Sequence, residues 1–176
     1  VTSIGYVPAM PTDNEATFWF EDANGAMVAW YVDIGFDPND LKPGDEVSFD
    51  AVAVTDYFDI LEVRSPDDGA TIPAAINFER VAQGNPVHVI DGMAGPPLTF
   101  EQRMHTVEVW GGLVAGPTDC GGLDCYDLEY GANTITFRTD SSYTQLGDCI
   151  HLISPLGAFS GAPQVDDANF DWAYFY

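Results

Sequence analysis

The residues of this chain that could take part in chemistry are its cysteines, its histidines and a large number of carboxylates. Cys120 and Cys125 bracket a Gly-Gly-Leu-Asp loop, a C-x₄-C spacing that suits either a short disulfide or one half of a zinc site. A zinc site would need a second pair of cysteines, and the nearest histidine, His151, stands alone. We therefore expect a Cys120–Cys125 disulfide and, with it, an oxidising compartment. Cys149 would then be free or would bridge to another chain.

The remaining polar residues do not indicate catalysis. A catalytic nucleophile needs a base within hydrogen-bonding reach and a third group that orients this base. His88, His105 and His151 are scattered, without a Gly-x-Ser-x-Gly elbow or a phosphate-binding glycine loop beside them. Pairs of acids that could hydrolyse glycosides are expected by chance among 28 carboxylates. We expect a protein that is not an enzyme and that requires no cofactor.

The net charge of −23 arises from 28 acidic residues against five Lys and Arg. Nucleic-acid affinity depends on Lys and Arg that displace condensed cations, so we exclude nucleic acid as a partner. Two interpretations of the charge remain open: solubility in a salty or extracellular medium, and binding of a divalent cation. Ca²⁺ is the cation that abundant hard oxygens favour, and Asp37, Asn39 and Asp40 form one candidate cluster. This cluster lacks the twelve-residue spacing of an EF-hand loop.

The apolar residues alternate with period two along most of the chain, which predicts strands rather than helices. In the second half the pattern is clear at Val107 and Val109, at Tyr126 and Leu128, and again at residues 135–137 and 150–152. Twelve prolines and 17 glycines separate these runs as turn residues. No run of 18 apolar residues occurs, so we expect no membrane insertion. The fold class is predicted to be all-β.

The pattern of loops and strands occurs twice. Pro-Thr-Asp at 11–13 and at 117–119 is followed each time by a hairpin-like segment, and then by a stretch ending in Gly-Asp, at 44–45 and at 147–148. A repeat of this length predicts two similar domains in tandem. We place them at 1–84 and 101–176, joined by a Gly- and Pro-rich linker over 85–100.

Each copy has five expected strands, which fits the OB-fold, a five-stranded Greek-key barrel. The helix between its third and fourth strands would shrink to one turn, at 38–41 in the first copy and at 142–145 in the second. The predicted architecture is therefore two tandem five-stranded OB-fold-like Greek-key barrels.

Aromatic residues of the first copy suggest a ligand-binding surface. If Phe18, Val28 and Trp30 point into the barrel, strict alternation places Trp19 and Tyr31 on its outside. That outer face receives oligonucleotides or oligosaccharides in OB-folds. We expect Trp19 and Tyr31, joined by Tyr57, to form a platform on which sugar rings stack. The alternative is that these aromatic rings pack against the other domain or the linker.

Several motifs resemble one bacterial family. Phe-Trp-Phe-Glu-Asp at 18–22 with Val-Ala-Trp-Tyr-Val at 28–32 is similar to the hairpin of OB-fold domains that accompany secreted bacterial nucleases and phosphoesterases. Residues 41–49, 54–58 and 83–87 resemble later segments of the same domains, and residues 147–165 resemble a segment of their second domain. The resemblance implies accessory OB-fold domains, with the catalysis of those proteins lying in a separate domain absent here.

We therefore expect a secreted, non-catalytic tandem OB-fold module that mediates binding or acts as a spacer, on the cell surface or outside the cell. Its partner would be a carbohydrate or another protein. The alternative is a self-assembling extracellular structural protein, a filament or surface-layer subunit that forms homo-oligomers. The aromatic segment at 170–176 suggests this alternative, because such a segment must be covered by something.

Overall fold

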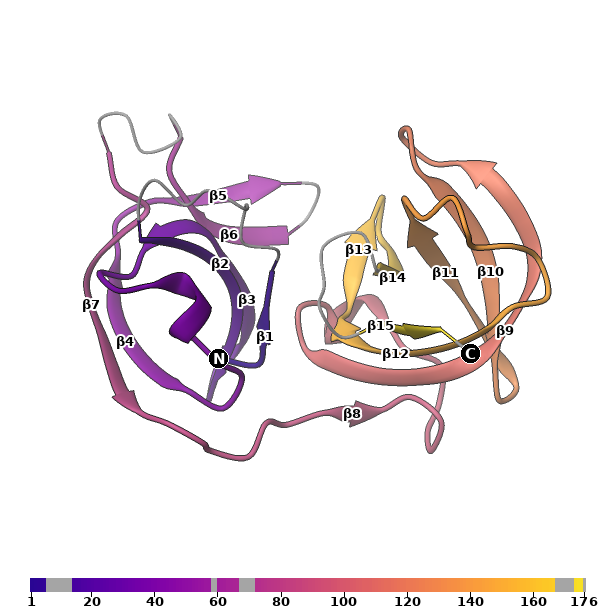
Figure 1. Ribbon diagram of the computed structural model, residues 1–176, viewed down its shortest axis with the longest axis horizontal. Helices are drawn as coiled ribbons and strands as arrows, with labels where there is room; N and C mark the ends of the chain where they lie inside the picture. The colour runs from indigo at the N-terminus through magenta and orange to yellow at the C-terminus, as the bar shows by residue number, and fades with distance from the viewer. Residues whose placement is uncertain (6–13, 58–59, 67–71, 167–172, 176) are drawn as a thin grey trace. The chain divides into compact units, whose positions relative to one another are not determined.

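The computed structural model describes residues 1–5, 14–57, 60–66, 72–166 and 173–175, and the fold is all-β, with no α-helix among these residues. The chain divides into two compact units, Val1–His88 and Val89–Tyr176, called here the first and second units (Figure 1). The segment expected as a linker, 85–100, is shared between them, since its first four residues belong to the first unit. Its remainder contains strand β8, Ile90–Asp91, which pairs with β9 of the second unit.

The first unit contains a five-stranded sheet with the order β1-β2-β3-β6-β5 and a separate antiparallel pair, β4 and β7. The β3–β6 pair is parallel and the other pairs of the sheet are antiparallel. Figure 1 shows these strands curled around a common interior. The strands are β1 (Ser3–Ile4), β2 (Glu15–Asp22), β3 (Gly25–Asp33), β4 (Glu46–Ala51), β5 (Val54–Tyr57), β6 (Ile60–Arg64) and β7 (Ala75–Ala82).

The second unit is built on one sheet, in which β13-β14-β11-β10-β9-β12-β15 is the order and β8 is added alongside β9. The β11–β14 pair is parallel, like β3–β6 in the first unit. Besides β8, the strands are β9 (Thr106–Asp119), β10 (Asp124–Tyr130), β11 (Asn133–Thr139), β12 (Cys149–Pro155), β13 (Gly157–Phe159), β14 (Ala162–Asp166) and β15 (Ala173–Phe175). A short 3₁₀ turn, η2 (Phe100–Gln102), precedes β9.

The expected single turn at 38–41 is confirmed as the 3₁₀ turn η1 (Pro38–Asp40). Pro38 is the first residue of this turn, and its ring fixes the φ angle there. The carboxylate of Asp37 accepts a hydrogen bond from the backbone N–H of Asn39. In the second unit the corresponding residues form an ordinary turn at 142–143.

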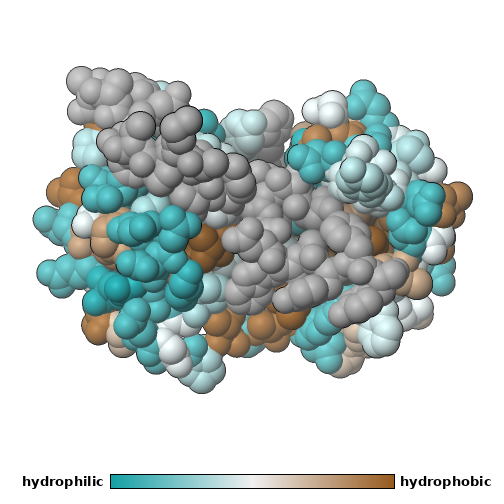
Figure 2. All heavy atoms as spheres, in the orientation of Figure 1, coloured by the Kyte–Doolittle hydropathy of each residue, from teal (hydrophilic) through white to brown (hydrophobic). Residues whose placement is uncertain are grey.

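Each unit has its own core. In the second unit the predicted alternation is confirmed, because the residues expected to face inward are buried together: Val107, Val109, Leu113, Tyr126, Leu128, Ile135, Phe137, Ile150 and Leu152. In the first unit Phe18 is buried with Val32, Leu41 and Val63, while the rings of Phe20 and Phe49 pack on this core without being fully covered. On the face shown in Figure 2, hydrophilic residues predominate and hydrophobic ones are exposed in small groups.

Candidate functional site

Trp19 does not belong to an exposed surface. It is 6% exposed, and a Cβ atom built on Gly5 would lie 3.1 Å from its ring. Strand β1 pairs with β2 at this point, with Ser3 opposite Trp19. The prediction of an exposed Trp19 is therefore wrong, because the chain around Gly5, which has no side chain, lies directly against the ring.

The pairing of β2 with β3 contains a β-bulge. Ala16 pairs with Val32, and two residues later Phe18 pairs with Ala29, so β3 has one residue more than β2 in this interval. Within the bulge Tyr31 has a φ angle of 50°, which is in the left-handed region. Its backbone N–H donates to the hydroxyl of Thr17 at 3.3 Å.

The bulge corrects the predicted faces of β3. Val28 pairs with Trp19, and Ala29 lies in the core opposite Phe18. Val32 also lies in the core, although Val28 and Val32 would share a face in a regular strand. An extra residue in a bulge shifts the alternation by one position. This shift explains why Val28 and Val32 do not share a face of the strand.

The bulge places neighbouring aromatic side chains close together. The rings of Trp30 and Tyr31 are perpendicular, with centroids 5.5 Å apart. Arg64 of β6, which pairs with Trp30, lies 5.8 Å from the centroid of Trp30 and 5.6 Å from that of Tyr57. Tyr31 is 46% exposed and Tyr57 is 49% exposed. We call Trp30, Tyr31, Tyr57 and Arg64 the aromatic cluster. It retains two of the three residues predicted for the platform, with Trp30 in place of Trp19.

A buried acid lies next to this cluster. Glu62 precedes Arg64 by two residues on β6, and its carboxylate lies 3.3 Å from the Arg64 guanidinium. Burial raises the pKa of Glu62, and the hydrogen bond and charge of Arg64 oppose this effect. The contact with Glu62 also helps to hold the guanidinium near the two aromatic rings.

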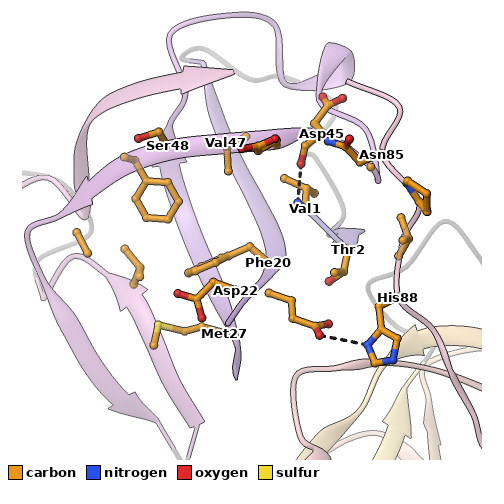
Figure 3. Close-up of a pocket in the computed structure, with 18 of the residues that line it drawn as sticks. Val1, Thr2, Phe20, Asp22, Met27, Asp45, Val47, Ser48, Asn85 and His88 are labelled. Atoms are coloured by element: carbon orange, nitrogen blue, oxygen red, sulfur yellow. Dashed lines mark hydrogen bonds and ion pairs between the residues drawn. The ribbon is translucent and has the colours of Figure 1, made fainter. Parts of the chain in front are cut away.

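The first unit also contains a pocket of about 760 Å³. Its apolar wall includes Phe20, Met27, Val47, Phe49 and Val63. Acidic residues lie at its edge: Glu21, Asp22, Asp45 and Glu46. Figure 3 shows Phe20 and Met27 on one side of the space and the chain from Asp45 to Ser48 on another. Sequence reasoning did not find this pocket, because the residues come from segments that lie far apart in the chain.

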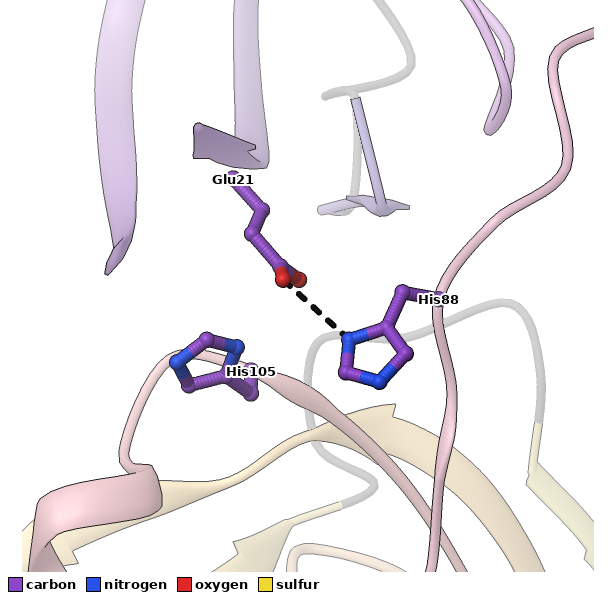
Figure 4. Close-up of side chains that lie close together, drawn as sticks. All are labelled: Glu21, His88 and His105. Carbon is purple, nitrogen blue, oxygen red and sulfur yellow. Dashed lines mark hydrogen bonds and ion pairs between the residues drawn. The ribbon is translucent and has the colours of Figure 1, made fainter. Parts of the chain in front are cut away.

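Two histidines are paired with carboxylates. In the first unit His88 Nδ1 lies 3.1 Å from a carboxylate oxygen of Glu21 (Figure 4). In the second unit His151 Nε2 lies 2.7 Å from a carboxylate oxygen of Glu108, and the His151 ring is 6.3 Å from that of Trp110, which is 62% exposed. Neither pair was predicted from the sequence, since the partners are 67 and 43 positions apart.

The predicted disulfide between Cys120 and Cys125 is confirmed, with Cα atoms 6.0 Å apart. It joins the end of the β9 region to β10. Cys149, at the start of β12, is a free and exposed thiol. The three residues predicted as a Ca²⁺ site, Asp37, Asn39 and Asp40, are exposed around η1. One oxygen of Asp37 accepts from both the backbone and the side-chain nitrogens of Asn39, and cation binding there stays a prediction.

No helix within the described ranges is long and apolar enough to cross a membrane. No family model matches the chain, and no curated protein matches it either. Among solved structures, it is similar to the crystal structure of the tetrameric p202 HIN2, with a TM-score of 0.43 and 7% identity over 99% of this chain and 87% of that chain. A likeness this distant supports no conclusion about fold or function, so the site must be interpreted from its own residues.

Proposed function

We propose that the protein is a non-catalytic binding module that takes up carbohydrate on the aromatic cluster of its first unit. The observation that carries the proposal is the bulge at Tyr31. A non-glycine residue in the left-handed region is strained by about 1–3 kcal/mol and persists where its surroundings hold it. Such strain and such bulges are concentrated next to functional sites, where they redirect side chains.

The effect of this bulge is to bring two successive aromatic side chains together beside an arginine. In a regular strand Trp30 and Tyr31 would point to opposite faces of the sheet. Here their rings are in contact, and the guanidinium of Arg64 lies near the rings of both Trp30 and Tyr57. The surface therefore combines aromatic rings with a group that can donate hydrogen bonds.

Carbohydrate is the ligand class that suits this combination. A sugar ring offers an apolar C–H face to an aromatic ring and hydroxyl groups to an arginine fork. Nucleic-acid bases also stack on aromatic rings, but they come with phosphates that a chain of net charge −23 repels. Arg64 also shares its charge with the carboxylate of Glu62, which reduces its attraction for phosphate.

We further propose that the two units are tandem OB-fold-like barrels in a secreted protein. In support, each unit has an antiparallel series of three strands, β1-β2-β3 or β9-β10-β11, whose last member pairs in parallel with a later strand. The disulfide supports an oxidising compartment, on the cell surface or outside the cell.

A glycan array followed by calorimetry on the glycans retained tests carbohydrate binding. Tyr31→Ala and Tyr57→Ala should each weaken binding about tenfold, which is the loss expected for one stacking contact of about 1.4 kcal/mol. Tyr31→Gly should weaken it similarly while tolerating the left-handed backbone. The matched control is Tyr143→Ala, which removes a 92% exposed tyrosine from the second unit and should change nothing. Glycan binding that survives all three changes in the first unit would refute the proposal.

Self-association is the second candidate, favoured by strand β5. This strand lies at the edge of its sheet and exposes Val54 and Tyr57. Edge strands with exposed apolar residues can pair with another chain. Sedimentation velocity over a wide concentration range separates the candidates, because the structural protein should form large assemblies and the binding module should remain a defined species.

A further inference from the structure

We infer that the pocket of the first unit binds a small apolar molecule that carries a positive charge, such as an alkyl or aryl ammonium ion. The pocket is distinct from the aromatic cluster, since none of Trp30, Tyr31, Tyr57 and Arg64 lines it. The inference therefore does not depend on carbohydrate binding.

The volume and wall of the pocket suit a small molecule. At about 760 Å³ it lies within the range of about 300–1,000 Å³ that is usual for small-molecule sites. The rings of Phe20 and Phe49 meet edge to face in its wall, with centroids 5.3 Å apart. Met27, on the strand paired with that of Phe20, adds a side chain that can adapt to the shape of a ligand.

The apolar wall is only partly covered by the protein itself. Phe20, Met27, Val47 and Phe49 pack against the core of the first unit but remain partly accessible. Covering such surface with a ligand is favourable by about 25 cal/mol per Å² of apolar area. An apolar ligand would thus bury the surface of these four side chains that the protein leaves accessible.

The charges at the edge of the pocket determine which sign of charge a ligand can carry. Four carboxylates line it, together with the ammonium group of Val1, which donates to the backbone carbonyl of Asp45 at 2.7 Å, and no Lys or Arg does. Two of the carboxylates have a charged or ionisable partner: Asp45 is paired with Arg80 at 3.5 Å and also accepts from the Lys42 backbone N–H at 3.0 Å, and Glu21 contacts His88. The exposed Asp22 and Glu46 leave an excess of negative charge at the edge.

The ionisation of Asp22 reinforces this excess. The backbone and side-chain amides of Asn24 donate to its carboxylate at 2.7 and 3.1 Å, and these hydrogen bonds lower the pKa of Asp22. A cation at the pocket would gain from these carboxylates and from the faces of the aromatic rings, which attract ammonium groups. An anion of the same shape would be repelled.

Three probes of equal chain length test the inference: hexyltrimethylammonium, 1-hexanol and hexanoate, each titrated at low salt and followed by NMR and calorimetry. The cation should bind about tenfold more tightly than the alcohol, and hexanoate should bind most weakly. Perturbed signals should come from Phe20, Met27 and Phe49. Raising the salt concentration should reduce the advantage of the cation and leave the alcohol unchanged.

Two sets of variants localise the effect. The double variant Asp22→Asn, Glu46→Gln should remove most of the advantage of the cation without affecting the alcohol. The matched control is Asp127→Asn, Glu129→Gln, which makes the same change of charge on the exposed face of β10 and should leave all three affinities unchanged. Met27→Trp should fill the pocket and weaken all probes. The inference is overturned if no probe binds at millimolar concentration, if the three bind equally, or if both double variants act alike.

Discussion

The β2–β3 hairpin of the first unit and the β10–β11 hairpin of the second occupy equivalent places in their sheets but differ in regularity. In each, the first strand pairs with the preceding antiparallel strand and the second strand pairs in parallel with a later one. The β10–β11 pairing runs without interruption over seven residue pairs, from Asp124 with Thr139 to Tyr130 with Asn133. The β2–β3 pairing is interrupted by the bulge at Tyr31.

The outer faces of the two hairpins differ accordingly. Along β10 and β11 the alternation stays regular, and Asp127, Glu129 and Arg138 occupy the outer positions. Arg138 lies 3.5 Å from Asp166 of the parallel neighbour β14, an ordinary ion pair between strands. The arginine at the parallel neighbour of β3, Arg64, instead lies among aromatic rings. One extra residue in β3 thus accounts for the contrast between the acidic, solvated face of the β10–β11 hairpin and the candidate binding surface of the β2–β3 hairpin.

The interiors of the units differ as well. The second unit buries Phe137, Leu128, Ile150 and Leu152 completely. The first unit leaves Phe20 and Phe49 half-buried at its pocket. The first unit therefore leaves more of the apolar surface around its core accessible than the second unit does.

The largest expected effect tests this difference in packing. Phe137→Ala should lower the free energy of unfolding of the second unit by about 3–5 kcal/mol, because it removes a fully buried ring. Phe49→Ala should cost the first unit about half as much, since its ring is partly exposed and already borders a cavity. Urea unfolding followed by hydrogen exchange of each unit measures both values. Equal losses would mean that the first unit is packed as tightly as the second.

The next effect concerns the disulfide, which belongs to the second unit alone. Cys120 and Cys125 close a loop with a sequence separation of five, and removing so short a closure should destabilise that unit by about 2 kcal/mol. The double variant Cys120→Ser, Cys125→Ser provides the test, with thermal unfolding as the measurement. Cys149→Ser is the control and should leave the unfolding midpoint unchanged, because the thiol is exposed. A comparable loss in the first unit would show that the two units unfold together.

Much of the fold could be predicted from the sequence because most strands keep a strict period of two. Along 126–130 and 133–139 large apolar or aromatic residues alternate with polar ones, and this alternation predicts the buried face correctly. The short loop between Cys120 and Cys125 likewise leaves few geometries besides a disulfide.

The candidate sites were harder to predict because they depend on departures from that period. Residues 26–32 are all apolar or aromatic, so alternation cannot decide which side chains point inward. The prediction for Val28 and Trp30 assumed a regular strand, and the bulge at Tyr31 invalidates this assumption. The burial of Trp19 has a different cause, since the chain at Gly5 covers its ring. The unbroken apolar run was the available signal, since it warns that the period is not defined there. The pocket has no local signal at all, because it depends on how distant strands curl.

The smallest expected effect concerns Glu62, the buried acid on β6, the strand that also carries Arg64 of the aromatic cluster. Burial raises the pKa of Glu62 in the folded protein above its ordinary value of 4.5, with Arg64 opposing the shift. The folded state therefore favours the protonated carboxyl, so this group's contribution to stability is greatest below about pH 4.5 and is lost as the pH rises through the folded pKa. Glu62→Gln should remove that dependence and match the original protein at low pH, while being slightly more stable at neutral pH. Free energies of unfolding from pH 4 to 7 measure the difference, with the exposed Glu129→Gln of the second unit as the control. A variant that instead becomes less stable at neutral pH would show that the ion pair with Arg64 outweighs the cost of burying the charge.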